Sequence, residues 1–279
     1  MRTINLNDVT KKVKENLMSA CEDIPEEVLA RLRRAEKEEE SELGKKVIAE
    51  IIKNDELAAR KHLPICQDTG VVVCFVEIGN QVHFEGNLYD AINQGVREAY
   101  TEGYLRKSVV AHPLNRVNTK DNTPAIIHVK LVEGDTFKVD LAPKGGGSEN
   151  MSLVKMLIPA DGIPGIKKLV LDTVFHAGGK PCPPVIVGIG IGGNLEKSAL
   201  LAKEALLRPI DDEASDEKTR ELERELLKEI NDLGVGPMGF GGTVTCLAVK
   251  INTHPCHIAS LPVAINIQCH AARHKSFTL

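Results

Sequence analysis

The chain of 279 residues is long enough for one large domain or two smaller ones, and its 42% hydrophobic residues are enough for a buried core. A formal net charge of -4, no one-signed basic stripe and no tryptophan argue against a nucleic-acid-binding protein. No apolar run reaches the roughly 18 residues that a membrane helix needs, so we expect no membrane association and a cytoplasmic location. Seven scattered cysteines predict reduced thiols or metal ligands rather than a secreted disulfide framework.

Residues 8–60 are predicted to be helical. Apolar side chains such as Leu17, Leu32 and Ile51 recur there at helical spacing. The charge-dense run 33–42 is predicted to be the solvated face of a helix. We therefore interpret the first 60 residues as a helical, structural region.

A loop with the sequence HLPICQDTG, residues 62–70, is predicted to lead from this region into a strand over Val71–Ile78. Cys66, Gln67 and Asp68 place a thiol, an amide and a carboxylate on one short connection, where catalytic groups are commonly held. An Asx-type turn with an incidental cysteine explains the same residues. The loop alone leaves both interpretations open.

A helix is predicted over about residues 89–104, and Arg106 follows its end. A guanidinium there can pair with a substrate carboxylate, although a surface cation is the simpler interpretation. Residues 125–142 are predicted to form a β-hairpin around the turn 133–135. The segment KGGGSEN, residues 144–150, follows, and its glycines let backbone N–H groups approach an anion at the start of a helix predicted for MSLVKML.

Another helix is predicted over residues 164–177, and Cys182 comes shortly after it, ahead of two prolines. A Cys-Pro pair is a recurrent feature of iron-sulfur ligands. The next segment, GIGIGG, formally satisfies the dinucleotide pattern G-x-G-x-x-G between a strand and a helix over 195–207. A dinucleotide fold needs a second parallel strand after that helix, ending in an acidic residue, but the sequence continues as a turn and a charged helix. Nicotinamide binding is therefore the weaker interpretation.

The last third of the chain contains a glycine-dense loop, GVGPMGFGG, and a strand that carries Cys246. These glycines allow either close approach to a site or a tight crossing, and the sequence does not decide between them. A buried strand is predicted over Ile258–Ile267, and it delivers Cys269 among flanking histidines, as in one wall of a metal site.

Three cysteines thus lie on loops or strand ends, namely Cys66, Cys182 and Cys269. Their spacing matches no compact zinc or ferredoxin pattern, but distant ligands can converge in a fold. Three thiolates on a 4Fe-4S cluster would leave one iron without a protein ligand, and an open iron can act as a Lewis acid on a hydroxyl and a carboxylate.

Six motifs in order, LPICQDTG, LRKSVV, KGGGSEN, CPPVIVGIGIGG, GPMGFGG and HIASLPVAINIQCHAARH, resemble those of the class I iron-sulfur fumarate hydratases and the related L-tartrate dehydratases. The resemblance runs from about residue 8 to the end. It implies a 4Fe-4S cluster with one open, labile iron, bound by Cys66, Cys182 and Cys269. It further implies proton transfer by Asp68 and substrate contacts from Gln67, Asp68, Arg106, the Gly146 backbone and His257.

Single-chain members of that family continue into a second domain, so the chain resembles the separate α subunit of a two-subunit enzyme. The resemblance implies reversible hydration of fumarate to (S)-malate with a β subunit, in an assembly with two copies of each chain. An L(+)-tartrate dehydratase α subunit is the alternative. An NAD-binding oxidoreductase built on GIGIGG and a non-catalytic iron-sulfur partner are the rival classes.

The predicted fold class is α+β, with mixed sheets flanked by helices after the helical N-terminal region and with the cluster on loops and strand ends. We expect a single domain over residues 1–279, in which residues 61–279 form the cluster-binding core.

Overall fold

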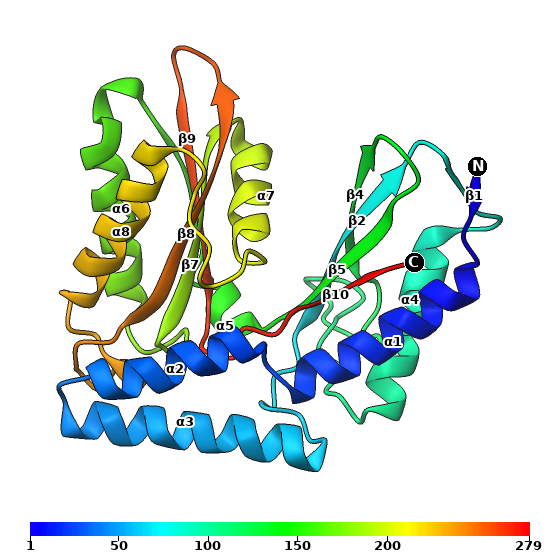
Figure 1. Cartoon of the computed structure of the whole chain (residues 1–279), viewed down its shortest axis with the longest axis horizontal. Helices are drawn as coiled ribbons and strands as arrows, with labels where there is room; N and C mark the ends of the chain where they lie inside the picture. Colours follow the sequence, from blue (N-terminus) through cyan, green and yellow to red (C-terminus); the bar gives the residue numbers. More distant parts are fainter. The chain divides into compact units, whose positions relative to one another are not determined.

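A computed structural model describes all 279 residues and shows an α+β chain that divides into two compact units (Figure 1). The first unit contains Met1–Pro25, Asp55–Gly146 and Arg273–Leu279, and the second contains Glu26–Asn54 and Gly147–Ala272. The predicted α+β class is confirmed. The expectation of a single domain stays a prediction.

Three helices form the N-terminal region, as predicted: α1 (Leu6–Glu22), α2 (Glu26–Glu38) and α3 (Glu42–Lys61). The side chain of Asn5 caps α1 by accepting a hydrogen bond from the backbone of Asn7. Along the chain, α3 begins in the second unit and ends in the first. No helix is both long and apolar enough to cross a membrane.

The first unit is built on a four-stranded sheet in the order β10-β5-β2-β4. Its strands are β2 (Val71–Gly79), β4 (Ile126–Val132), β5 (Phe137–Lys144) and β10 (Lys275–Thr278). The helix α4 (Leu88–Glu102) lies in the same unit, and β1 (Arg2–Thr3) pairs in parallel with β3 (Val82–His83).

The predicted hairpin over residues 125–142 is wrong, although both of its strands exist. Strand β2 lies between β4 and β5, parallel to the first and antiparallel to the second. Buried along almost its whole length, β2 is a near-continuous apolar run that needs a neighbour on each side. The turn after β2 also takes the hydrogen bonds that a hairpin would use, because Gly79 donates to Thr136 and Asn80 donates to Val132.

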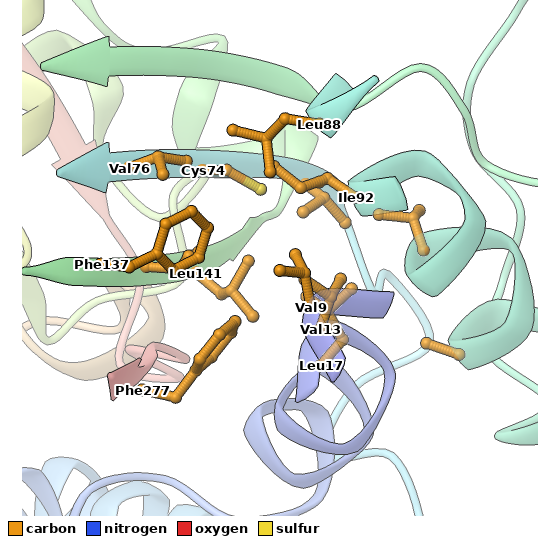
Figure 2. Close-up of a cluster of buried hydrophobic side chains, with 14 of the residues drawn as sticks. Val9, Val13, Leu17, Cys74, Val76, Leu88, Ile92, Phe137, Leu141 and Phe277 are labelled. Carbon is orange, nitrogen blue, oxygen red and sulfur yellow. The ribbon is translucent and has the colours of Figure 1, made fainter. Parts of the chain in front are cut away.

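The core of the first unit lies between α1 and this sheet (Figure 2). Val9, Val13 and Leu17 repeat every fourth residue, so they share one face of α1 and meet Phe137 and Leu141 of β5. Leu88 and Ile92 of α4, Cys74 and Val76 of β2, and Phe277 of β10 complete the labelled cluster. Cys74 is fully buried, as predicted for a core residue.

The second unit is built on a sheet in the order β6-β9-β7-β8. Its strands are β6 (Leu153–Leu157), β7 (Val185–Gly193), β8 (Cys246–Cys256) and β9 (Leu261–Gln268). The helices α6 (Gly162–Ala177) and α8 (Glu217–Asn231) cover one face, and α7 (Leu195–Ala205) covers the other (Figure 1). Strand β7 is parallel to β8 and antiparallel to β9.

Two predicted elements of this unit are corrected. The segment predicted as the helix MSLVKML contains β6, and only the short α5 (Gly146–Glu149) precedes it. The strand predicted from Ile258 begins at Leu261, because His257 and Ser260 close a turn in which Ile258 is 92% exposed.

The glycines of GIGIGG are used in helix packing. Val187 and Ile189 of β7 face the core with α6 and α8, so Gly188 and Gly190 face α7. A methyl group at Gly190 would overlap the carbonyl oxygen of Ser198, within α7. The charged helix predicted after α7 is confirmed as α8, and the next strand parallel to β7 is β8, which ends at Cys256 without an acidic residue.

Candidate active-site residues

Cys182 and Cys269 lie at the same end of the second unit's sheet. Cys182 comes shortly before β7 begins, and Cys269 directly follows the end of β9. Because these strands are antiparallel, the start of one lies beside the end of the other, and Ile186 pairs with Gln268. The backbone N–H of His270 donates to the carbonyl of Cys182 at 3.4 Å. The fold thus brings two of the three predicted cluster ligands together.

The backbone around Cys182 is held by the glycine-dense loop before β8. Cys182 has φ +56°, in the left-handed region that non-glycine residues rarely adopt. Met238 N–H donates to the carbonyl of Pro183 at 2.7 Å. A methyl group at Gly179 would lie 2.7 Å from the carbonyl oxygen of Met238, and one at Gly239 only 2.6 Å from the Cα of Gly179. Gly239 of GPMGFGG therefore serves close approach to the Cys182 loop.

Glu39 supports this loop from the N-terminal region. Its carboxylate accepts hydrogen bonds from the backbone N–H groups of Thr243 at 2.9 Å, Val244 at 2.8 Å and Ser41 at 2.8 Å. Burial acts to raise the pKa of Glu39, but these hydrogen bonds outweigh it and hold the pKa below its usual value. The prediction that the whole run 33–42 is solvated is wrong at Glu39, which is 1% exposed. The sequence does not distinguish Glu39 from the glutamates on either side of it.

Gln268 is a second residue that sequence reasoning missed. Its side chain is buried, and its Nε2 donates to the carbonyl of Ala271 at 3.0 Å and lies 3.4 Å from the Sγ of Cys269. The amide therefore orients the segment that carries Cys269. The sequence does contain a signal for this role. Gln268 ends an apolar strand, and a polar side chain buried there needs hydrogen-bond partners nearby.

In the first unit, Asp68 is fixed by two backbone donors. Its Oδ1 accepts from Gly70 N–H at 3.0 Å, and its Oδ2 accepts from Gly146 N–H at 2.8 Å. The first bond is the Asx-type turn that the sequence left open. The second shows that the glycine-rich segment meets an anion, namely the Asp68 carboxylate. The fold thus brings together Asp68 and Gly146, two of the predicted site residues.

Buried side chains hold the backbone at Asp68 and directly after it. The hydroxyl of Tyr100 donates to the carbonyls of Thr69 and Gly70, at 2.6 and 3.1 Å. Arg273 donates from Nη1 to the carbonyl of Asp68 at 2.6 Å. Sequence reasoning singled out neither Tyr100 nor Arg273.

Cys66, Gln67 and Arg106 are exposed in the same unit. The carbonyl of Arg106 accepts a hydrogen bond from the hydroxyl of Thr69 at 3.1 Å, which ties the Arg106 backbone to the Asp68 loop. The guanidinium of Arg106 makes no salt bridge within the chain. It therefore remains available to an external carboxylate.

His257 lies at the other end of the second unit's sheet. It lines an open pocket of about 440 Å³ with Gly193, Asn194, Lys197, His254, Pro255 and Cys256. The eight residues of β9 separate this end from Cys269, which at roughly 3.3 Å per residue is about 26 Å. Within one chain, His257 does not share a site with Cys182 and Cys269.

Comparison with known proteins shows the family. Residues 10–278 match the family model described as fumarate hydratase (Fumerase). The chain belongs to this family. A putative L(+)-tartrate dehydratase subunit alpha of Methanocaldococcus jannaschii is 45% identical over 272 residues, which cover 95% of this chain and 95% of that relative. The L(+)-tartrate dehydratase subunit alpha of Escherichia coli strain K12 is 30% identical, over 96% of this chain and 89% of its own length. The chain is thus the α subunit of a hydro-lyase.

The cysteines of this family member fall into two chemical groups. Burial raises the pKa of Cys21 to about 11 and that of Cys246 to about 12, and it raises the pKa of Cys74 as well, so these thiols stay protonated near neutral pH. The other four are not buried, namely Cys66, Cys182, Cys256 and Cys269. None of the seven forms a disulfide.

The donor chemistry fits a cluster held by thiolates. The three predicted ligands all belong to the four cysteines that are not buried, and two of them, Cys182 and Cys269, lie at the same end of the sheet. No three His, Cys, Asp or Glu side chains in the chain are grouped closely enough to hold a single metal ion. The three predicted thiol ligands thus suit a cluster chemically, and two of them, Cys182 and Cys269, lie at the same end of the sheet.

Proposed function

We propose that this hydro-lyase subunit acts with a β subunit to add water reversibly across the double bond of fumarate, giving (S)-malate. The match to the fumarate hydratase family over residues 10–278 carries the proposal. The carboxylate of Asp68, fixed by two backbone N–H groups, supports it.

Cys66, Cys182 and Cys269 would hold a 4Fe-4S cluster. When bound, such a group supplies a Lewis-acidic iron for the hydroxyl and a carboxylate of the substrate. Cys21, Cys74 and Cys246 are unsuited to this role, because their buried thiols resist the deprotonation that a ligand needs.

Asp68 is the proposed proton-transfer group of this chain. Each of its carboxylate oxygens accepts one backbone hydrogen bond, so each keeps a lone pair for a proton. The two bonds fix the direction of the carboxylate, which is the geometric requirement for general acid–base catalysis.

Removing a proton beside a carboxylate produces a highly anionic state, which cations and N–H donors must stabilise. Arg106 is exposed and free of salt bridges, so it can bind a substrate carboxylate in a bidentate manner. The exposed amide of Gln67 is a further donor next to Asp68, and the backbone N–H of Gly146 acts through the Asp68 carboxylate that it holds. The partner subunit would supply the second proton-transfer group and the remaining cations.

His257 fits this proposal only in an assembly. The length of β9 keeps it about 26 Å from Cys269 in its own chain. An assembly with two copies of each subunit would allow His257 of one copy to complete the site of the other. The α-subunit names of the relatives support the presence of a partner chain.

Dehydration of L(+)-tartrate is the second candidate. It is favoured by the names of the relatives that match along nearly the whole chain. Malate and tartrate both carry two carboxylates and both lose water from a carbon that bears a hydroxyl, so the residues above serve either reaction. Substrate choice then depends on contacts to the additional hydroxyl of tartrate.

The test is an anaerobic preparation of this chain with its partner subunit, assayed on fumarate, malate and L(+)-tartrate. We expect turnover of fumarate and malate by the complex and little turnover by either subunit alone. Turnover of tartrate alone would select the second candidate. Replacing Asp68 by Asn should lower kcat by roughly 10² to 10⁴ and leave the iron content intact. Full activity of Asp68→Asn would instead indicate a non-catalytic iron-sulfur partner.

A further inference from the structure

Arg273 is a buried cation that the proposed reaction does not use. Only 4% of its surface is exposed. It makes one hydrogen bond, from Nη1 to the carbonyl of Asp68, while its buried Nε has no partner. No carboxylate forms a salt bridge with it. Burying a guanidinium with so few hydrogen bonds costs free energy, so its charge and its one hydrogen bond call for a structural explanation.

The guanidinium lies beside the reactive carboxylate as well as the backbone of Asp68. A methyl group built on Gly145 would lie 3.2 Å from Oδ2 of Asp68 and 3.4 Å from Nη2 of Arg273. Both groups therefore border the same small space next to the glycine-rich segment. Glycine at position 145 leaves that space open.

The positive charge of Arg273 is felt by the buried groups around it. Burial raises the pKa of the Cys21 thiol and of the Tyr100 hydroxyl, and Arg273 acts in the opposite direction on both. Tyr100 itself donates to the carbonyls of Thr69 and Gly70. Arg273 and Tyr100 thus hold three consecutive carbonyls, those of residues 68, 69 and 70.

We propose that Arg273 is a positioning residue that fixes the backbone of Asp68, and through it the direction of the carboxylate, for proton transfer. This inference rests on the proposed role of Asp68. The carbonyl of Asp68 is anchored by Arg273, and its two carboxylate oxygens are anchored by Gly70 and Gly146. With backbone and side chain both fixed, the carboxylate has one orientation.

Two substitutions test the contact between Arg273 and the carbonyl of Asp68. Arg273→Gln keeps a donor and removes the charge, whereas Arg273→Lys keeps the charge and shortens the side chain. Lys275→Met is the matched control, because it removes a cation two residues further along whose partner is Asp23. Amide hydrogen exchange of residues 66–70 is measured by mass spectrometry on the cluster-loaded chain, and kcat and KM are measured in the complex with the partner subunit.

We expect faster exchange at residues 66–70 in both Arg273 variants, with other segments unchanged and with Lys275→Met like the unmodified chain. We also expect kcat to fall by ~100-fold with little change in KM, because a displaced carboxylate affects the chemical step more than binding. Unchanged exchange at residues 66–70 in both variants overturns the proposal, as does a loss of kcat that only follows the folded fraction. If the unmodified complex hydrates neither fumarate nor tartrate, the proposed function fails, and the exchange measurement still decides whether Arg273 fixes the loop.

Discussion

The two ends of the second unit's sheet are built differently, although the same strands reach both. At the end with Cys182 and Cys269, backbone hydrogen bonds, close glycine contacts and the buried Glu39 fix the chain. At the end with His257, the chain forms an open pocket next to a turn whose Ile258 is 92% exposed. Ligands must be held in place by their surroundings, so the end with Cys182 and Cys269 is the better candidate for holding a prosthetic group.

The same comparison separates nearness in sequence from nearness in space. His257 and Cys269 belong to one sequence motif, but β9 runs between them and carries them to opposite ends of the sheet. Cys182 and Cys269 are far apart in sequence but lie at the same end of the second unit's sheet. Strand direction, rather than motif membership, decides which of these residues can act together within one chain.

Replacing a cysteine at each end should give the largest contrast. We expect Cys182→Ser or Cys269→Ser to abolish most of the bound iron, the visible absorbance and the activity, because a cluster loses a thiolate ligand. Cys256→Ser, at the open end, should leave all three largely unchanged. Iron content and absorbance of anaerobically prepared variants provide the measurement, and equal losses from Cys182→Ser and Cys256→Ser would remove the distinction between the ends.

The stability of the end with Cys182 and Cys269 should depend on Glu39. We expect Glu39→Gln to lower the free energy of unfolding by about 3 kcal/mol at neutral pH, because a buried charged acceptor of backbone hydrogen bonds is lost. The exposed Glu40→Gln is the matched control and should change little. Urea denaturation of both variants measures the effect, and equal values for them would contradict the role of Glu39.

The pH dependence of that stabilisation has a defined sign. The pKa of Glu39 is lower in the folded chain than its ordinary value of 4.5. Its contribution is therefore fully present above about pH 4.5 and is lost as the pH falls through the lowered pKa. The difference in unfolding free energy between the unmodified chain and Glu39→Gln should stay constant from pH 7 to pH 5 and shrink below pH 4.5. A difference that grows on acidification would contradict the prediction.

Strand β7 joins the two ends, and its glycines should be structural. We expect Gly190→Ala to lower the free energy of unfolding by about 2 kcal/mol, because the added methyl group overlaps the Ser198 carbonyl in α7. Thermal or urea denaturation measures this, and addition of NAD should leave the transition unchanged. An unaltered transition in Gly190→Ala, or a shift with NAD, would revive the dinucleotide interpretation.

A substitution at the end with His257 should have the smallest effect on activity. We expect His257→Asn to lower kcat/KM by roughly 10-fold, as for the loss of one hydrogen bond to a charged group, and to leave iron content and absorbance intact. The measurement is steady-state kinetics of the two-subunit complex alongside iron analysis. Loss of iron in His257→Asn would show that the open end contributes to the cluster after all.

The sequence by itself determined the local elements and the candidate chemistry. Helical periodicity located the helical region 8–60, which the structure divides into α1, α2 and α3, and apolar runs located β2 and β7, because periodicity records which face of an element is buried. It also separated Cys74 and Cys246, which lie within strands, from cysteines on loops and strand ends. The Asp68 turn was foreseeable, since a carboxylate two residues before Gly70 can accept its N–H.

Only the tertiary structure decided how distant segments meet. Strand β2 separates β4 from β5, Glu39 is buried against Val244, and Arg273 reaches the backbone of Asp68. None of these pairings leaves a local signal, because a hydrogen bond between residues far apart in the chain imposes no periodicity on either segment. The position of His257, away from Cys269, follows from the direction of β9, which the sequence motif that contains both residues does not reveal.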